Sequence, residues 1–233
     1  MKSINLLQLY PKDMNIYGDW GNTLVLKRRL EWHGYGVQLL EYNPGDEFPQ
    51  GVDLIVGGGG QDSGQLKIRD DLQKIGPALR ALADDGVPML VICGMYQLFG
   101  NFFKTKDGEM ISGIKLLDIE TVGGTERLIG NIVTSSEQFG LIVGYENHSG
   151  LTTLGANARP LGQVIRGAGN TEGACYRNVI GTYLHGSLLP KNPAIADWLI
   201  EQAVTRKFGD FTPTVIEDRF AMLARDIAQR RPR

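Results

Sequence analysis

The chain has 233 residues, of which 42% are hydrophobic, so it is long enough for one large α/β domain and apolar enough to build a core. Its 24 lysines and arginines are spread among 26 aspartates and glutamates, and this near-neutral balance disfavours binding to DNA, RNA or an anionic membrane. Cys93 and Cys175 are the only cysteines, too few for a disulfide framework or a thiolate metal cluster. We therefore expect the function to lie in a cleft, with no metal bound.

The N-terminal segment contains only a short apolar stretch, which Gln8 and Pro11 interrupt, so it cannot act as the hydrophobic part of a secretion signal. No run of 18 apolar residues occurs elsewhere in the sequence. We therefore expect a cytoplasmic protein.

The first half of the sequence predicts alternating strands and helices. Strands are expected at residues 4–10, 37–41 and 52–56, and helices at residues 23–33 and 68–85. Asn22 is the expected N-cap of the first helix, and Gly76-Pro77 is expected to break the second. This alternation is typical of a parallel, doubly wound sheet.

The segment VICGMYQLFG, residues 91–100, places a cysteine where a strand changes to a helix. Residues 88–92 are wholly apolar, as in a buried parallel strand, and residues 94–103 carry aromatic side chains at helical spacing. A thiol on such a turn lies at the carboxyl edge of the sheet and faces the positive end of a helix, which favours the reactive thiolate. Cys93 is therefore the candidate nucleophile, although a buried cysteine can also simply fill a core.

From residue 114 onward, short β-rich runs replace the alternation of strands and helices. These runs cover residues 115–122, 128–135, 140–150, 162–167 and 178–186. They predict a strand-rich second half that packs on the first sheet or extends it. Two helices are expected to close the chain, at residues 192–207 and 215–230. With no internal repeat and no long linker, residues 1–233 are expected to form a single domain.

Thiol catalysis requires a base, and the chain offers three histidines. His185 follows the strand-like run at residues 180–184 and precedes a glycine, so it should emerge at the end of a strand. His148 is a second candidate at a junction between strand and loop, whereas His33 lies at the end of a helix. A structural role is the alternative for each, but a cysteine and a histidine at two sheet edges favour catalysis.

An acyl-transfer site also needs backbone N–H groups that stabilise an oxyanion. Four glycines follow the third expected strand, where the chain can turn sharply and expose its amides. We expect Gly59 and Gly94 to supply the two donors. A glycine-rich loop can instead hold a phosphate, but GGGGQDSG matches neither common nucleotide-binding pattern.

Three motifs occur in a family-specific order: GGGGQD, VICGMYQLFG and GTYLHG. With them the chain resembles the class I glutamine amidotransferases, in the branch shared with cobyric acid synthase. The runs NIYGDWGN, GGGGQD, ERLIGN and GYENHSG narrow the resemblance to the glutaminase subunits of lipid II isoglutaminyl synthase. The resemblance covers about residues 4–210 and implies a flavodoxin-like α/β fold with a mainly parallel central sheet.

The resemblance implies roles for individual residues. Cys93 matches the family's nucleophile, His185 its general base and Arg127 the ligand of the substrate α-carboxylate, a group that a guanidinium holds well. From the residues alone, Arg127 would be a solvated loop residue. Gln97 lies one helical turn beyond Cys93 and is expected either to contact the substrate amide or to lie on the helix surface. Cys175 is expected to be an inert core thiol.

The implied activity is hydrolysis of L-glutamine to glutamate and ammonia, with no cofactor bound by this chain. The implied partner is a MurT-like Mur-ligase subunit, in a heterodimer or larger complex, that uses ATP and Mg²⁺ to amidate the D-glutamate of lipid II to D-isoglutamine. The sequence itself has no ATP-binding motif. Two alternatives stay open: amidation of a corrin or another cofactor, and a non-catalytic subunit that senses glutamine.

The chain departs from the commoner family pattern at two points. Met95 stands where glycine is usual, which predicts a looser turn or a narrower pocket. The run at residues 185–187 lacks the glutamate that triad families place two residues after the histidine. We therefore expect an acidic residue of the partner to orient the histidine, with Asp19, Asp62 and Glu146 as the candidates within this chain.

Overall fold

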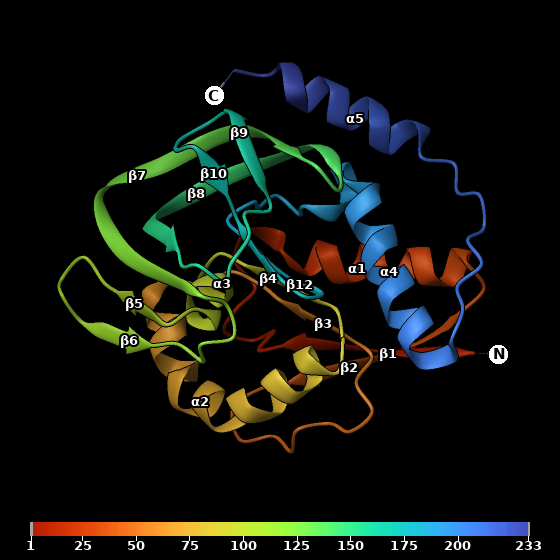
Figure 1. Cartoon of the computed structure of the whole chain (residues 1–233), viewed down its shortest axis with the longest axis horizontal. Helices are drawn as coiled ribbons and strands as arrows, with labels where there is room; N and C mark the ends of the chain where they lie inside the picture. The colour runs from red at the N-terminus through yellow and green to blue at the C-terminus, as the bar shows by residue number, and fades with distance from the viewer. Residues whose placement is uncertain (1, 233) are drawn as a thin grey trace.

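The computed structural model describes residues 2–232 and is built around a six-stranded sheet (Figure 1). Its strand order is β11-β12-β4-β3-β1-β2. The strands are β1 (Ser3–Leu9), β2 (Gly36–Tyr42), β3 (Leu54–Gly57), β4 (Met89–Ile92), β11 (Ala174–Tyr176) and β12 (Val179–Thr182). All pairs are parallel except β11 with β12, at one edge. The predicted doubly wound parallel sheet is confirmed.

Helices cover both faces of this sheet. They are α1 (Trp20–Trp32), α2 (Asp62–Asp84), α3 (Gly94–Phe99), α4 (Pro193–Phe208) and α5 (Arg219–Arg230), with short 3-10 turns η1 (Ile16–Gly18) and η2 (Leu189–Lys191). In Figure 1, α2 lies on one side of the sheet, and α1 and α4 lie on the other. Every residue of β3 and β4 is buried, as expected for strands between two helical layers. No helix of residues 2–232 is long and apolar enough to cross a membrane.

Helices α1 and α2 each differ from the expectation at one residue. Because α1 begins at Trp20, Asn22 lies inside the helix and is not its N-cap; its Oδ1 accepts the Leu189 N–H at 2.9 Å. The helix α2 continues through Pro77 without the expected break. A proline removes one helical hydrogen bond, but the apolar face of α2 remains buried on the sheet on both sides of it. Gly76 instead allows a close approach to Ile114, whose Cγ2 would lie 3.0 Å from an added Cβ.

The helix after the cysteine is shorter than its aromatic spacing predicts. It ends at Phe99, and the next aromatic residues enter β5 (Phe102–Lys104). An added Cβ at Gly100 would lie 2.8 Å from the Ile119 carbonyl oxygen, so the chain passes close to the following strand here. Strand pairing of β5 with β6 (Met110–Ser112) and β7 therefore outweighs the local helical pattern.

A second six-stranded sheet packs beside the first one (Figure 1). It consists of β5, β6, β7 (Ile119–Ser136), β8 (Gly140–Leu154), β9 (Gly162–Arg166) and β10 (Thr171–Glu172). The long strands β7 and β8 form an antiparallel pair. The strand-rich second half thus packs on the first sheet, while β11 and β12 return to extend it. One cluster of buried apolar side chains includes residues from both sheets.

Candidate active site

Four loops meet at the carboxyl edge of the first sheet, where open α/β folds bind their ligands. Cys93 directly follows β4, and the turn that ends in His185 follows β12. The glycines at residues 57–60 end and follow β3, and residues 10–19 follow β1. The predicted positions of the cysteine and the histidine after strands are confirmed, and the pairing of β4 with β12 makes the two strand ends neighbours.

Cys93 has a backbone conformation that side chains rarely adopt. Its φ and ψ angles are 50° and −107°, and its N–H donates to the Thr182 carbonyl at 2.8 Å. Such strain is retained where the surrounding structure enforces it, and in α/β-hydrolases a sharp turn between strand and helix presents the nucleophile. The side chain is buried at the start of α3, and the residue lines a cavity.

His185 lies between Cys93 and a carboxylate of the same chain. Its Nδ1 is 3.2 Å from Asp19 Oδ2 and 3.4 Å from Asp19 Oδ1, and both residues are fully buried. Among residues 2–232, no other group forms a hydrogen bond with Nε2, which is left for the Cys93 thiol. Burial alone would lower the pKa of His185, but its contacts with Asp19 and Cys93 raise that pKa to about 10.

Asp19 corrects our expectation that an acidic residue of a partner orients the histidine. The carboxylate missing from the run at residues 185–187 is supplied 166 positions earlier in this chain. The other two candidates lie elsewhere: Asp62 is at the start of α2, on the cavity wall, and Glu146 is next to His148. A Cys-His-Asp triad is therefore assembled within one chain.

Gly59 does not provide the expected oxyanion donor, because its N–H donates to Asp19 Oδ2 at 2.8 Å. A side chain here is excluded: an added Cβ would lie 2.8 Å from His185 Cε1, 3.0 Å from Asp19 Oδ2 and 3.2 Å from Cys93 Cβ. Gly94 is the first residue of α3, where N–H groups lack helical partners. The nitrogen of Gly60 would lie 3.0 Å from a Cβ on Gly94, so Gly60 is the neighbour that replaces Gly59 as a candidate donor.

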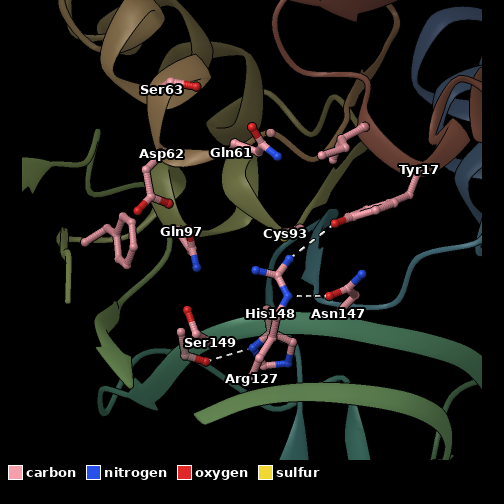
Figure 2. Close-up of a pocket in the computed structure, with 14 residues that line it drawn as sticks. Tyr17, Gln61, Asp62, Ser63, Cys93, Gln97, Arg127, Asn147, His148 and Ser149 are labelled. Carbon is pink, nitrogen blue, oxygen red and sulfur yellow. Dashed lines mark hydrogen bonds between the residues drawn. The ribbon is translucent and has the colours of Figure 1, made fainter. Parts of the chain in front are cut away.

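A cavity of about 350 Å³ opens onto the cysteine (Figure 2). It lies between the edge of the first sheet and the β7–β8 pair of the second. Its walls are Ile16, Tyr17, Gly60, Gln61, Asp62, Ser63, Cys93, Gln97, Phe103, Arg127, Asn147, His148, Ser149 and Gly150. The structure thus brings three predicted site residues, Cys93, Gln97 and Arg127, to a single cavity.

Arg127 belongs to β7 and not to a loop, and its exposed side chain lies at the mouth of this cavity. It lies within the irregular stretch of β7, where the register with β8 shifts between Gly123 and Leu128. Its Nε donates to Asn147 Oδ1 at 2.6 Å, and one terminal nitrogen donates to the Tyr17 hydroxyl at 3.2 Å. Figure 2 shows the guanidinium held between these two partners, facing the cysteine. An exposed, oriented guanidinium here fits the predicted role of carboxylate ligand.

The orientation of the Gln97 amide is fixed by Gln65, a residue that the sequence analysis did not single out. Gln65 Nε2 donates to the Gly94 carbonyl at 3.0 Å and to Gln97 Oε1 at 2.8 Å. Because a backbone carbonyl only accepts, the amide nitrogen of Gln65 must face this side, and Gln97 must present its oxygen to it. Gln97 Nε2 then donates to the Tyr183 hydroxyl at 3.2 Å. Gln97 is buried, so the surface alternative is wrong, and it offers donors to the cavity.

Met95 does not narrow the cavity. It is fully buried on the opposite side of the turn, and its Cγ would lie 3.1 Å from a Cβ on Gly57. The expectation of a narrower pocket is therefore wrong, because this side chain fills the core behind the nucleophile.

His148 also lines the cavity, but other groups engage its ring. Its Nδ1 is 2.8 Å from the Gly150 carbonyl oxygen, and its Nε2 is 3.6 Å from Glu146. The ring stacks on Tyr183, with centroids 3.6 Å apart. These contacts make His148 part of the wall and leave His185 as the base.

His33 and Cys175 lie away from the cavity. His33 is the C-cap of α1, in agreement with its predicted helix-terminal position, and its Nδ1 accepts the Thr214 N–H. Burial raises the pKa of Cys175 to about 11, which disfavours the thiolate and agrees with the expected inert thiol.

Comparison with known proteins fits this geometry. The model of the CobB/CobQ-like glutamine amidotransferase domain matches residues 5–193. The chain belongs to this family. The GatD subunit of the lipid II isoglutaminyl synthase (glutamine-hydrolyzing) from Staphylococcus aureus (strain N315) is 38% identical, over 97% of this chain and 95% of its own. This amidotransferase is also 33% identical to the cobyric acid synthase of Chlorobium chlorochromatii (strain CaD3), over 60% of this chain and 31% of that one.

A search of solved structures also finds glutamine amidotransferases with this fold. A crystal structure of a glutamine amidotransferase superposes with a TM-score of 0.61 at 14% identity, covering 84% of this chain and 98% of the other. The flavodoxin-like amidotransferase fold expected from the sequence is confirmed.

Proposed function

We propose that this amidotransferase is the glutaminase subunit of a lipid II isoglutaminyl synthase. The observation that carries the proposal is the convergence of Cys93, His185 and Asp19 at one sheet edge, with Arg127 across the same cavity. This arrangement suits hydrolysis of an amide in a substrate that also has a carboxylate. The similarity to GatD over nearly the whole chain supports the specific acceptor.

In the proposed reaction, L-glutamine binds with its α-carboxylate on Arg127 and its side-chain amide at Cys93. Gln97 donates from the wall of the cavity, and its fixed amide cannot turn to accept from the substrate. His185 accepts the proton of the Cys93 thiol, and its contacts with Asp19 and Cys93, which raise its pKa to about 10, favour the imidazolium that forms.

The thiolate attacks the carboxamide carbon, and the amides of Gly94 and Gly60 stabilise the oxyanion. When the C–N bond breaks, His185 transfers its proton to the leaving nitrogen and ammonia departs. Neutral His185 then removes a proton from water, which attacks the thioester and releases glutamate. The thiolate and the imidazolium are regenerated, and Asp19 stabilises the cation at both ends of the cycle. No step requires a metal or a cofactor.

The ammonia passes, in this proposal, to a MurT-like Mur-ligase subunit in a heterodimer or larger complex. That partner uses ATP and Mg²⁺ to activate the carboxylate of D-glutamate in lipid II, and the product is D-isoglutamine. Lipid II is therefore reached through the partner and not through this chain.

The test is a coupled assay with the purified chain and its Mur-ligase-like subunit. We expect glutamate release from glutamine in step with amidation of lipid II, and loss of both with the Cys93→Ala variant. Ammonium chloride should restore amidation to that variant, because the ligase site remains intact. Hydrolysis without lipid II amidation would favour a corrin or other cofactor as the acceptor. Glutamine binding with no hydrolysis would favour the glutamine sensor.

A further inference from the structure

The C-terminal helix α5 presents its apolar side to solvent. Phe220, Leu223 and Ile227 are spaced by three and four residues, so they form one stripe along the helix. They are 71%, 54% and 50% exposed, and no residue of α5 is buried. Figure 1 shows α5 at the periphery of the molecule. A helix normally turns its apolar stripe towards the core, but among residues 2–232 nothing buries this stripe.

Polar contacts at its two ends hold the helix in this orientation. Asp218, just before α5, accepts from the buried Arg29 guanidinium at 2.6 Å. Near the other end, Arg166 donates to the Gln229 carbonyl, and Asn131 Nδ2 donates to the Pro232 carbonyl at 2.7 Å. The stripe is therefore displayed by a fixed helix and is not the side of a loosely attached tail.

The stripe borders a groove of about 480 Å³ that leads to the catalytic loop. Ile227 and Ala224 form one wall, and Tyr145 and Gly186 form the other. The carbonyl of Tyr145 accepts the N–H of His185 at 2.8 Å, so the groove adjoins the backbone that positions the base.

The groove is also positively charged. Lys191 and Arg231 line it together, and Lys191 donates to the Gly186 carbonyl at 3.3 Å. Burial and the nearby charge of Arg231 lower the pKa of Lys191. Two like charges at one site favour a carboxylate between them. The groove thus matches an apolar segment that carries an acidic residue.

Helix α5, and all of α4 except its first residue, lie beyond the part of the chain that the family model matches. The family model ends at residue 193, whereas the match to GatD covers 97% of this chain. In the cobyric acid synthase, the matching part is 31% of one longer chain. A domain joined covalently to the rest of its enzyme needs no separate docking surface, but a free subunit does.

We propose that the α5 stripe and its groove form the docking surface for the ligase subunit, which inserts an apolar segment with an acidic side chain. This inference rests on the proposed function. A protein segment fits these features better than a lipid surface does, because a flat bilayer would cover the stripe and leave the groove unfilled.

The test measures binding of the purified Mur-ligase-like subunit to the full chain by calorimetry. The double variant Leu223→Asp/Ile227→Asp should raise Kd at least about tenfold, since truncating or charging central apolar contacts has effects of this size. Both side chains are exposed, so the melting temperature and the glutaminase activity of the isolated chain should stay unchanged. Met110→Asp, an equally exposed residue on the distant β6, is the matched control and should bind normally.

A charge reversal tests the groove separately. Arg231→Glu should weaken binding and reduce its dependence on salt, whereas Lys106→Glu, in the exposed β5–β6 turn, should do neither. If wild type binds the ligase and the α5 variants bind equally well, the docking assignment is overturned and the proposed function stands. If the wild-type chain itself does not bind the ligase, both the docking assignment and the proposed function are wrong. A third outcome would assign α5 to a membrane. In that case the wild-type chain binds vesicles with 30% phosphatidylglycerol, the α5 variants do not, and ligase binding is the same for both.

Discussion

The two walls of the catalytic cavity are built in different ways. On the first sheet, Cys93, His185 and Asp19 are buried and held by backbone and side-chain contacts. On the second sheet, Arg127 is exposed and is held by two side chains, Asn147 and Tyr17. Bond-breaking groups thus lie in a region of low dielectric, where their mutual electrostatic effects are strong. The recognition group stays accessible, because its ligand arrives from solvent.

This difference predicts how variants divide between turnover and affinity. Changes on the buried wall should lower kcat, because its charges act mainly on the transition state. Changes on the exposed wall should raise KM, because a carboxylate ligand binds ground state and transition state alike.

The largest effect is expected from Cys93. Cys93→Ala and Cys93→Ser should reduce glutamine hydrolysis by about 10⁴-fold or more, since no other nucleophile is placed at this turn and a serine hydroxyl is scarcely ionised. Steady-state glutamate release measures the loss, and circular dichroism should show an unchanged fold. A glutamine-like electrophile should label Cys93 in the wild-type chain. Labelling of Cys175 in place of Cys93 would contradict the assignment.

Asp19→Asn should have the next largest effect, a loss of about 10²–10⁴-fold in kcat. An amide can still accept from Gly59, but it no longer stabilises the imidazolium of His185. The pKa of His185 should then fall from about 10, because one of the two contacts that raise it is weakened. Measurement of kcat/KM against pH should place the alkaline limb near 10 in wild type and lower in the variant.

The raised pKa of His185 also makes the free energy of unfolding depend on pH. The pKa is raised in the folded state, from an ordinary value of 6.5 to about 10. Its stabilising contribution is therefore complete below about pH 6.5 and is lost as the pH rises through 10. Asp62→Asn is the control, because Asp62 lies on the cavity wall and does not contact the histidine. It should leave the pH dependence of kcat/KM and of the free energy of unfolding unchanged. If wild type and Asp19→Asn have the same alkaline limb, Asp19 does not orient His185, and an acidic residue of the partner is the remaining candidate.

The features that could be predicted from the sequence are those that local patterns of residues determine. The apolar run before Cys93 and the glycine after it fix a strand, a turn and a helix, and the parallel sheet then places His185 at the neighbouring strand end. Motif resemblance supplied Arg127, whose position on β7 no periodicity indicates.

The contacts that could not be predicted from the sequence are those between segments far apart along the chain. Asp19 and His185 are 166 residues apart, so only the completed fold brings them together. The hydrogen bond from Gly59 to Asp19 follows from that same contact, which is why the oxyanion prediction failed at this residue. The helix through Pro77 and the early end of α3 likewise depend on packing and strand pairing that outweigh local preference.

On the exposed wall, Arg127→Lys should raise KM for glutamine about 10- to 100-fold and change kcat only a few-fold. A lysine ammonium keeps the charge but cannot donate to Asn147 and Tyr17 and also present a planar pair of donors to a carboxylate. Tyr17→Phe removes only one of these contacts and should raise KM about two- to fivefold. An unaltered KM in Arg127→Lys would remove this residue from the binding site.

A smaller effect than that of Arg127→Lys is expected at Gln65, which orients the Gln97 amide. Gln65→Met keeps most of the side-chain volume but removes both donors, so the Gln97 amide is free to rotate and the Gly94 carbonyl loses a partner. We expect KM to rise about three- to tenfold and the free energy of unfolding to fall by about 1–2 kcal/mol, the usual cost of losing buried hydrogen bonds. Gln73→Met, on an exposed turn of the same helix, is the matched control.

A double-mutant cycle separates positioning of Gln97 from a general loss of stability. If Gln65 acts by orienting Gln97, then Gln65→Met should add little to the KM of a Gln97→Met variant, because no amide remains to be oriented. Its effect on the free energy of unfolding should persist, since the hydrogen bond from Gln65 to the Gly94 carbonyl is lost in both backgrounds. Equal increases in KM with and without Gln97 would show that Gln65 acts on the cavity by another route.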